Sequence, residues 1–425
     1  MATKKTFVYK VLAPDEPKWD ETTWDSSKWG GGGLKSLVAV WRGEVISDPT
    51  FRTLINGGDG EMVVSLARPF DDFGEGVDIS LNNTVELEVS DKEDSGKLIY
   101  RGFISSYTPT LKGEVQVLVV NVRGYGETLA KHMYKNESGN TTVVQNSKDP
   151  SAIFKDILDR FIDDGGELGY IATDIENTGS TVSYTFNTNT FREALDKVVE
   201  LAPEGWFWRL NPNGMVDFKQ KNTNVQHQLS TKKDISLLEP DKNMENVINE
   251  VHFIGGDTGG GENLYIVKRD ATSIDDYGVR ILKIVDGRVT LQATATTIAT
   301  RVLEERASPE RRTGARIIDS NGTGDNGFDI ESMKVGDTIQ FSELTGAVPT
   351  PTLWDTALWG VDVWDNTQFS SARDIMQVVS LIYSPDYLEV EATTRLPEIS
   401  KRIEDINRNF ESTTFSSNPS SPTEV

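Results

Sequence analysis

The sequence contains no cysteine, and only three of its 425 residues are histidine. Without cysteine the chain can form neither a disulfide scaffold nor a thiolate metal site, and it has no catalytic thiol. The histidines, His132, His227 and His252, have no local ligand spacing that would indicate a metal site. Motifs of the G-x-S-x-G, H-E-x-x-H and phosphate-loop types are also missing. The sequence therefore predicts a protein that is not an enzyme and uses no metal or other cofactor.

Long apolar runs and positive charge are scarce as well. No apolar stretch reaches the ~18 residues that a membrane span requires, and the first residues lack the apolar core of a signal peptide. The chain has 43 Lys and Arg residues against 66 Asp and Glu residues, a net charge of −23. Such an acidic surface repels phosphate backbones, so we expect no sequence-specific nucleic-acid binding. The composition predicts a soluble, acidic, multidomain protein.

Two segments imitate binding motifs. Residues 30–36, GGGGLKS, have Leu34 where a phosphate-binding loop requires glycine before its lysine, and we interpret them as a flexible linker. Residues 319–329, DSNGTGDNGFD, carry oxygen ligands at alternate positions but have Ile330 where an EF-hand loop requires glutamate. The same residues build polar hairpin turns, which is the interpretation we favour, and the calcium alternative stays open.

Short segments rich in Val, Ile, Tyr, Phe and Thr alternate with Gly, Asp and Asn clusters through the first third of the chain. This pattern predicts strands of an antiparallel barrel or sandwich. A similar set begins near position 247 and contains one helix, from about Ala293 to Ala307. We therefore expect a mainly β fold with α+β elements. The expected strands are Phe7–Leu12, Leu34–Ile46, Met62–Leu66, Thr84–Val89, Lys97–Ser105 and Glu114–Val122, then Val247–Ile254, Gly314–Ile318, Asp337–Phe341, Met376–Tyr383 and Leu388–Ala392.

The region between these two sets has a different pattern. It begins with a polar stretch, 136–149, that has no hydrophobic periodicity over most of its length. Apolar residues at i, i+3 and i+4 then predict a helix with Pro150 in its first turn. Thr190 followed by Glu193 forms a capping box that predicts the start of a second helix. Residues 211–214, Asn-Pro-Asn-Gly, predict a hairpin turn, so this region is expected to be a compact α/β domain.

These patterns divide the chain into successive parts. We expect two β-barrel-like domains with an α/β domain between them, tryptophan-rich loop insertions and a C-terminal helix. The expected boundaries are 1–135 for the first barrel with a loop at 17–33, 136–222 for the α/β domain, 223–348 completed by 372–395 for the second barrel, 349–371 for the second loop insertion, 396–411 for the helix and 412–425 for a disordered tail.

A five-residue tryptophan repeat occurs twice, and it holds six of the nine tryptophans. A period of five fits neither a helix nor a strand, and Asp after Trp can close an Asx-type turn. Each unit is therefore expected to be a tight loop that presents an indole. Such indoles can pack against protein, within this chain or a neighbour, or stack on sugar rings. The candidate partner-binding residues are Trp19, Trp24, Trp29, Trp354, Trp359 and Trp364.

The stretch from Leu396 to Phe410 has the spacing of a coiled-coil seam. Its apolar residues follow each other at intervals of 3, 4, 3 and 4, and isoleucine at both core positions favours trimers or tetramers. The alternative is an amphipathic helix that lies on its own domain, since two heptads are a short seam. The candidate oligomer contacts are Leu396, Ile399, Ile403, Ile406 and Phe410.

Four segments, in this order, carry a resemblance to a known family. They are residues 41–73, which begin WRGEVISDPT, then Thr190–Gln220, TFREALDKVVELAPEGWFWRLNPNGMVDFKQ, then Asn246–Gly256, NVINEVHFIGG, and Met333–Phe341, MKVGDTIQF. Together with the order of domains, they resemble the baseplate hub or tail-associated tip proteins of tailed bacteriophages, including the siphovirus Gp37-like branch. The likeness is architectural, since none of these segments is a catalytic signature.

The resemblance implies a structural protein of the virion, located at the tail tip and made in the cytoplasm of the bacterial host. Such hubs are homotrimers in which two similar barrels per subunit form a pseudo-sixfold ring. The ring joins the sixfold tail tube to the threefold tip and surrounds the channel for genome ejection. The implied partners are the distal tail protein, the tape-measure protein and tip or fibre proteins. The alternative is a carbohydrate-binding host-adhesion protein that uses the tryptophan repeats as stacking platforms.

Overall fold

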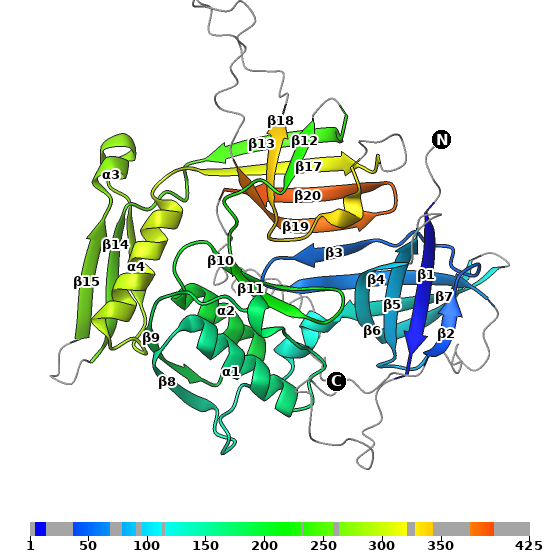
Figure 1. Ribbon diagram of the computed structural model, residues 1–425, viewed down its shortest axis with the longest axis horizontal. Helices are drawn as coiled ribbons and strands as arrows, with labels where there is room; N and C mark the ends of the chain where they lie inside the picture. The colour runs from blue at the N-terminus through cyan, green and yellow to red at the C-terminus, as the bar shows by residue number, and fades with distance from the viewer. Residues whose placement is uncertain are drawn as a thin grey trace, which may run out of the picture.

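The computed structural model describes residues 5–13, 37–68, 79–90, 96–112, 115–230, 233–257, 263–320, 328–342 and 375–394. Strands predominate in these residues, and the mainly β prediction is confirmed. Figure 1 shows a large sheet, a helical unit beside it, and a smaller sheet at one end of the molecule. The six repeat tryptophans, the predicted seam and the predicted tail lie outside the described residues.

Thirteen of the described strands form one hydrogen-bonded sheet. Its main path runs β13-β17-β20-β19-β3-β4-β7-β6-β5-β1-β2, while β18 pairs with β12 and β19 beside this path. The first seven strands are β1 (Thr6–Leu12), β2 (Leu37–Trp41), β3 (Phe51–Leu54), β4 (Gly58–Ala67), β5 (Thr84–Ser90), β6 (Lys97–Lys112) and β7 (Val115–Gly124). The others are β12 (His227–Ser230), β13 (Ile235–Asn243), β17 (Glu310–Ile318), β18 (Thr338–Ser342), β19 (Met376–Ser384) and β20 (Tyr387–Thr393).

The pairing of β3 with β19 joins the two strand-rich regions of the sequence. These strands run antiparallel, with Phe51 opposite Tyr383 and Leu54 opposite Ser380. One hydrophobic core extends across the junction, from Tyr9 of β1 to Val390 of β20. The sequence analysis did not foresee this connection, because β3 is only four residues long and was not among the expected strands. Where the individual domains begin and end stays a prediction.

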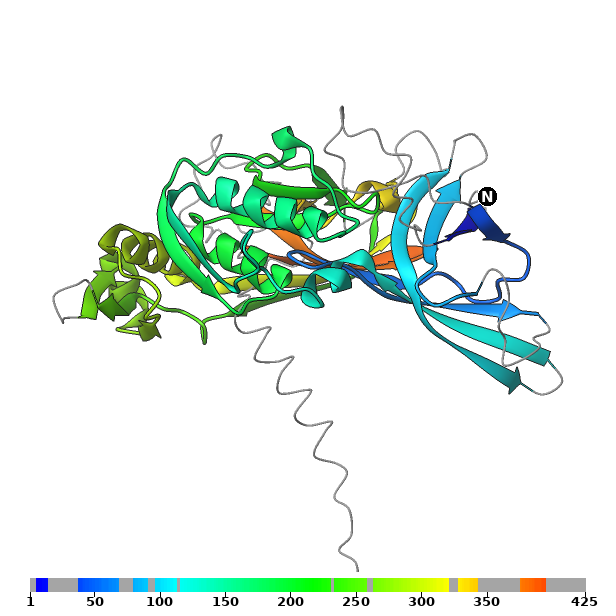
Figure 2. The same cartoon turned by 90° about the horizontal axis from the view of Figure 1, so that it is seen from below.

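A helical unit packs beside the large sheet. Helices α1 (Pro150–Asp163) and α2 (Phe191–Leu201) lie side by side, and Figure 2 shows them on one side of the strands, with the cyan strands of the first region curving away. The predicted helix starts are confirmed: the Asp149 side chain caps α1, and Thr190 and Glu193 form a capping box at α2. The unit also contains η2 (Tyr125–Ala130), β8 (Thr142–Lys148), η3 (Ala172–Asp174), β9 (Val182–Asn187), β10 (Trp206–Leu210) and β11 (Val216–Gln220).

Strand β8 corrects one expectation, since it lies in the polar stretch 136–149 that showed no hydrophobic periodicity. It is a strand because it pairs with β9, where Val143 lies opposite Phe186 and both side chains are buried. The alternate positions of β8 are exposed and polar or aliphatic, as in Thr142 and Val144. A short edge strand of this kind carries little signal in its own sequence.

A three-stranded sheet lies apart from the large one. Its order is β15-β14-β16, and helix α4 packs against it. These strands fall in the range expected for the second barrel, 223–348, but they pair only with one another and form a sheet of their own. Helix α4 covers one face of this sheet with Ala295, Ala299 and Leu303. The predicted helix near 293–307 is confirmed. The elements are β14 (Glu250–Asp257), β15 (Asn263–Arg269), α3 (Ala271–Tyr277), β16 (Ile281–Val285) and α4 (Gln292–Arg306). The short η4 (Ile330–Ser332) lies between β17 and β18 of the large sheet in sequence.

Candidate functional site

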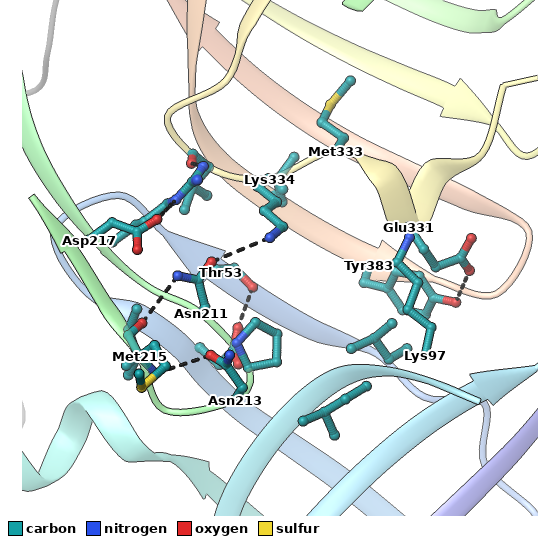
Figure 3. Close-up of a pocket in the computed structure, with 18 of the residues that line it drawn as sticks. Thr53, Lys97, Asn211, Asn213, Met215, Asp217, Glu331, Met333, Lys334 and Tyr383 are labelled. Carbon is teal, nitrogen blue, oxygen red and sulfur yellow. Dashed lines mark hydrogen bonds and ion pairs between the residues drawn. The ribbon is translucent and has the colours of Figure 1, made fainter. Parts of the chain in front are cut away.

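A cavity of about 480 Å³ lies where the β10–β11 hairpin meets the large sheet (Figure 3). Its wall combines apolar side chains with three cations and four carboxylates. These come from both strand-rich regions and from the helical unit between them. The charged lining residues are Lys97, Arg209, Lys334, Asp59, Asp174, Asp217 and Glu331.

Strand β10 connects two hydrophobic cores. Successive side chains of a strand point to opposite faces, so Phe207 enters the core of the large sheet while Trp206 and Trp208 enter the core of the helical unit. Trp208 is fully buried, its indole NH donates to Asp196 at 2.9 Å, and its backbone N–H donates to Asn56 at 2.8 Å. The predicted hairpin is therefore the joint between the two parts of the fold.

Arg209 holds this hairpin against the second strand-rich region. Its guanidinium donates to Asp217 of β11 at 2.8 Å and to Asp337 at 3.2 Å. Asp337 also accepts from the backbone N–H of Lys334 and lies 3.0 Å from a ring nitrogen of His227. Burial, and then the nearby Arg209, lower the pKa of Lys334. The residues that carry these contacts are far apart in sequence, so spacing gave no signal for them.

A second polar cluster ties the start of the chain to the later strands. The Lys5 ammonium lies 2.6 Å from Asp319 and 2.5 Å from Glu331, and the Tyr383 hydroxyl donates to Glu331 at 2.7 Å. Burial opposes the charged form of Lys5, but the hydrogen bonds to both carboxylates outweigh it and raise the pKa of Lys5. Burial raises the pKa of Glu331 to about 7. The Glu331 carboxyl can therefore take up a proton near neutral pH.

Asp59 is the second carboxyl of the cavity wall that titrates near neutrality. Burial raises the pKa of Asp59 to about 7, although a hydrogen bond from Thr53 at 2.7 Å and one from the backbone of Arg101 favour the charged form. In the sequence Asp59 looks like part of a glycine-rich turn, 56–60. The structure places it in β4, beneath the cavity.

The remaining candidates from the sequence have separate surroundings. His132 lies edge-on to the ring of Phe161, and His252 contacts Glu250 and Tyr265 on the small sheet. Among the described residues, no group of three or more His, Cys, Asp or Glu side chains is arranged to hold a metal. The ends of the 319–329 loop are engaged with protein, since Asp319 pairs with Lys5 and Asp329 caps η4. Residues 321–327 lie outside the described residues.

The described part of the chain also contains no helix long and apolar enough to cross a membrane. The geometry of the cavity offers ion pairs, two carboxyls that titrate near pH 7, and a junction of two cores. In this arrangement the β10–β11 hairpin joins the helical unit to the large sheet.

No protein-family model matches the chain, and no curated protein matches its sequence. Solved structures do match over almost the whole length. A 43 kDa tail protein of prophage MuSo2 from Shewanella oneidensis has a TM-score of 0.56 at 12% identity, with 92% of this chain and 98% of that chain covered. Prophage tail protein gp18 from Listeria monocytogenes has a TM-score of 0.55 at 10% identity, with 96% and 99% covered.

A tail protein from Neisseria meningitidis MC58 gives the same result, with a TM-score of 0.55 at 12% identity and coverage of 92% and 96%. At these identities the likeness concerns the fold. It includes the large sheet, the helical unit and the small sheet together, since each alignment leaves at most 8% of either chain uncovered. The chain thus has the fold of these prophage tail proteins over more than 90% of its length.

Proposed function

We propose that this chain is a structural protein of a phage tail tip, the subunit of a homotrimeric baseplate hub, and that it catalyses no reaction. The observation that carries the proposal is the match to three prophage tail proteins in which more than 90% of both chains is covered. A likeness confined to one barrel or one α/β unit would fit many unrelated functions. A shared arrangement of several units favours a shared structural role.

The sheet supports the proposed ring. In each chain, the pairing of β3 with β19 joins the two strand-rich regions into one sheet. Three such chains supply six strand-rich regions, which is what a ring needs to join the sixfold tail tube to a threefold tip. We propose that the ring surrounds the channel for genome ejection, and that the partners are the distal tail protein, the tape-measure protein and tip or fibre proteins.

The charge of the chain fits a channel for DNA. A trimer carries a formal charge of −69, three times −23. Acidic walls repel phosphate, so DNA would pass without binding to them. Within the same proposal, the seam at 396–410 contributes to subunit contact, and the tryptophan repeats at 17–33 and 349–371 contact neighbouring tail proteins during host attachment.

Light scattering of the purified chain across a dilution series tests the proposal. The hub function predicts a stable mass of about three times 47.1 kDa and ring-shaped particles in electron micrographs. A strict monomer at every concentration would count against the self-assembling hub.

Replacement of Trp354, Trp359 and Trp364 together by alanine separates the hub from the adhesin alternative. The hub function predicts that assembly with tail proteins is lost. The adhesin function predicts that glycan binding is lost while assembly is unchanged. Each readout also serves as the control for the other.

A further inference from the structure

The small sheet has one covered face and one uncovered face. Side chains of β14, β15 and β16 alternate between these faces. Val251 and Phe253 are fully buried under α4, and the neighbouring side chains on β15 and β16 are partly buried, namely Leu264, Ile266, Leu282 and Ile284. The face opposite α4 is called the outer face here, and it consists of Glu250, His252, Ile254, Tyr265, Val267, Arg269, Ile281, Lys283 and Val285.

The outer face exposes large apolar side chains in adjacent strands. Ile254 of β14 lies opposite Tyr265 of β15 and Val285 of β16, so these three form a row across the sheet. Tyr265 is 59% exposed and Val285 is 66% exposed, and Ile281 on the same edge strand is 61% exposed. Figure 1 shows this sheet at the left end of the molecule. Contiguous exposed apolar residues rimmed by polar ones mark interaction surfaces.

A hydrogen-bond network fixes the tyrosine in this row. The His252 ring lies 2.7 Å from the Tyr265 hydroxyl through Nδ1 and 2.6 Å from Glu250 through Nε2. The glutamate only accepts, so His252 in its neutral form donates through Nε2 and accepts a hydrogen bond from the Tyr265 hydroxyl at Nδ1. Arg269 holds the same glutamate through two hydrogen bonds of 2.8 and 3.1 Å. An exposed tyrosine with a fixed ring loses little conformational entropy when a partner covers it.

The charge of the outer face is opposite to that of the whole protein. It carries two cations, Arg269 and Lys283, and one anion, Glu250, so its formal charge is +1 when His252 is neutral. The chain as a whole carries −23. Arg269 has 63% of its side chain exposed, and Lys283 is exposed as well. The complementary surface is therefore an acidic one.

We propose that the outer face docks against an acidic surface of a second copy of this chain. In an assembly of identical subunits, every neighbour brings a net charge of −23. A twofold contact of two outer faces would bring Arg269 and Lys283 close to their own copies, whereas head-to-tail contact does not, and it forms a ring when the rotation between subunits closes. The proposal rests on the homotrimer of the proposed function and identifies one of its subunit surfaces.

Charge reversal at Lys283 tests this docking. The full chain carrying Lys283→Glu is compared with wild type by light scattering across a dilution series, at low and at high salt. We expect the concentration at which the trimer is half dissociated to rise at least tenfold in the variant. Lys135→Glu makes the same charge change at an exposed lysine of the helical unit and leaves that concentration unchanged.

Two changes at Tyr265 test the apolar part. Tyr265→Ala removes the ring and also raises the dissociation concentration at least tenfold, since buried aromatic anchors dominate interfaces. Tyr265→Phe removes only the hydrogen bond to His252 and raises the dissociation concentration about threefold. Circular dichroism spectra and melting temperatures equal to wild type verify that each variant is folded.

The outcomes separate the docking surface from the hub function. If wild type is a trimer and both Lys283→Glu and Tyr265→Ala dissociate like wild type, the outer face does not bind a second copy, while the hub function stands. Binding of a different tail protein to this face would give the same result. If wild type is a monomer at every concentration, the docking proposal and the homotrimer fail together.

Discussion

The large sheet and the helical unit are stabilised by contacts of different sequence range. In the sheet, Lys5 contacts Glu331 and β3 pairs with β19, so residues from the two ends of the chain meet. In the helical unit, Thr190 caps a helix through Glu193, three residues away, and residues 211–214 form a hairpin turn. The difference indicates that the helical unit is specified locally, whereas the sheet depends on the whole chain.

The hairpin β10–β11 makes both local and long-range contacts. Its turn is local, with the N–H of Gly214 donating to the carbonyl of Asn211 at 2.9 Å. Its long-range contacts run from Arg209 to Asp337 and from Trp208 to Asn56. A change that breaks a distant contact is therefore expected to cost more than one that removes a local cap. Three substitutions test this order, and a fourth tests the pH dependence of the junction.

Lys5→Ala has the largest expected effect. The substitution leaves the side chains of Glu331 and Asp319, which are 5% and 12% exposed, without their cation. Removal of one partner from a buried ion pair costs about 3–5 kcal/mol. Urea unfolding at pH 8 measures this loss. Because burial raises the pKa of Glu331 to about 7, protonation at pH 5 removes one of the two uncompensated charges, and the loss is smaller there.

Lys10→Ala is the matched control for this experiment. Lys10 lies in the adjoining strand β1 and pairs with Glu88, but their side chains are 36% and 21% exposed. A surface pair contributes about 0–1 kcal/mol. Equal losses for the two lysines would contradict the long-range role of Lys5.

Gly336→Ala breaks the packing of the hairpin against the second strand-rich region. Gly336 has φ of +86°, and a Cβ there would lie 2.2 Å from the ring of Phe207. We expect a loss of about 2–4 kcal/mol in the free energy of unfolding, from the strained backbone and the clash together. Gly139→Ala has a similar φ of +78° with no atom within 4 Å of the Cβ, so its loss is limited to about 1 kcal/mol. A loss as large at Gly139 would show that the backbone alone is responsible.

Asp59→Asn addresses the pH dependence of the junction. Burial raises the pKa of Asp59 from 3.8 to about 7, so between these values the folded chain holds a proton that the unfolded chain has lost. The free energy of unfolding therefore falls as pH rises from about 4 to 7 and stays low above it. The asparagine avoids burying this charge, and we expect the variant to be more stable than wild type by about 4 kcal/mol at pH 8 and close to it at pH 3.5.

Urea unfolding at the two pH values measures this difference. Asp163→Asn neutralises an exposed carboxyl at the end of α1 and is expected to change stability by less than about 0.5 kcal/mol at both. Since Glu331 titrates in the same range, the free energy of unfolding of the Asp59→Asn variant still depends on pH, but less steeply than that of wild type. An unchanged slope would mean that Asp59 is ionised throughout the range.

The sequence predicted the features that depend on neighbouring residues. Pro150 in the first turn of α1, the capping box at Thr190 and the hairpin at 211–214 each require only a few consecutive residues. The alternation of Val and polar residues in β5 gave its bounds within one residue, because one face of that strand is buried. Period and turn chemistry are properties of short windows, so they can be found without knowing what a segment packs against.

The candidate site needed information that no short window contains. Lys5 belongs to a pair of lysines that forms no motif, and only the fold brings it close to Glu331. Asp59 looked like a turn residue, and β3, with four residues, was too short to give a pattern. The β3–β19 junction of the large sheet is likewise set by pairings between residues more than 300 positions apart, which single-sequence periodicity does not contain.

Thr190→Ala has the smallest expected effect and tests the local side of the comparison. The Thr190 hydroxyl accepts from the backbone N–H of Glu193 at 3.2 Å, and the Glu193 carboxylate accepts from the N–H of Thr190 at 2.9 Å. Loss of such a cap costs about 1 kcal/mol, which the unfolding free energy at neutral pH measures. Thr190→Ser keeps the hydroxyl and stays close to wild type. If Thr190→Ala cost more than Lys5→Ala, the helical unit would depend on its cap more than the sheet depends on its buried ions, and the order argued from sequence range would be reversed.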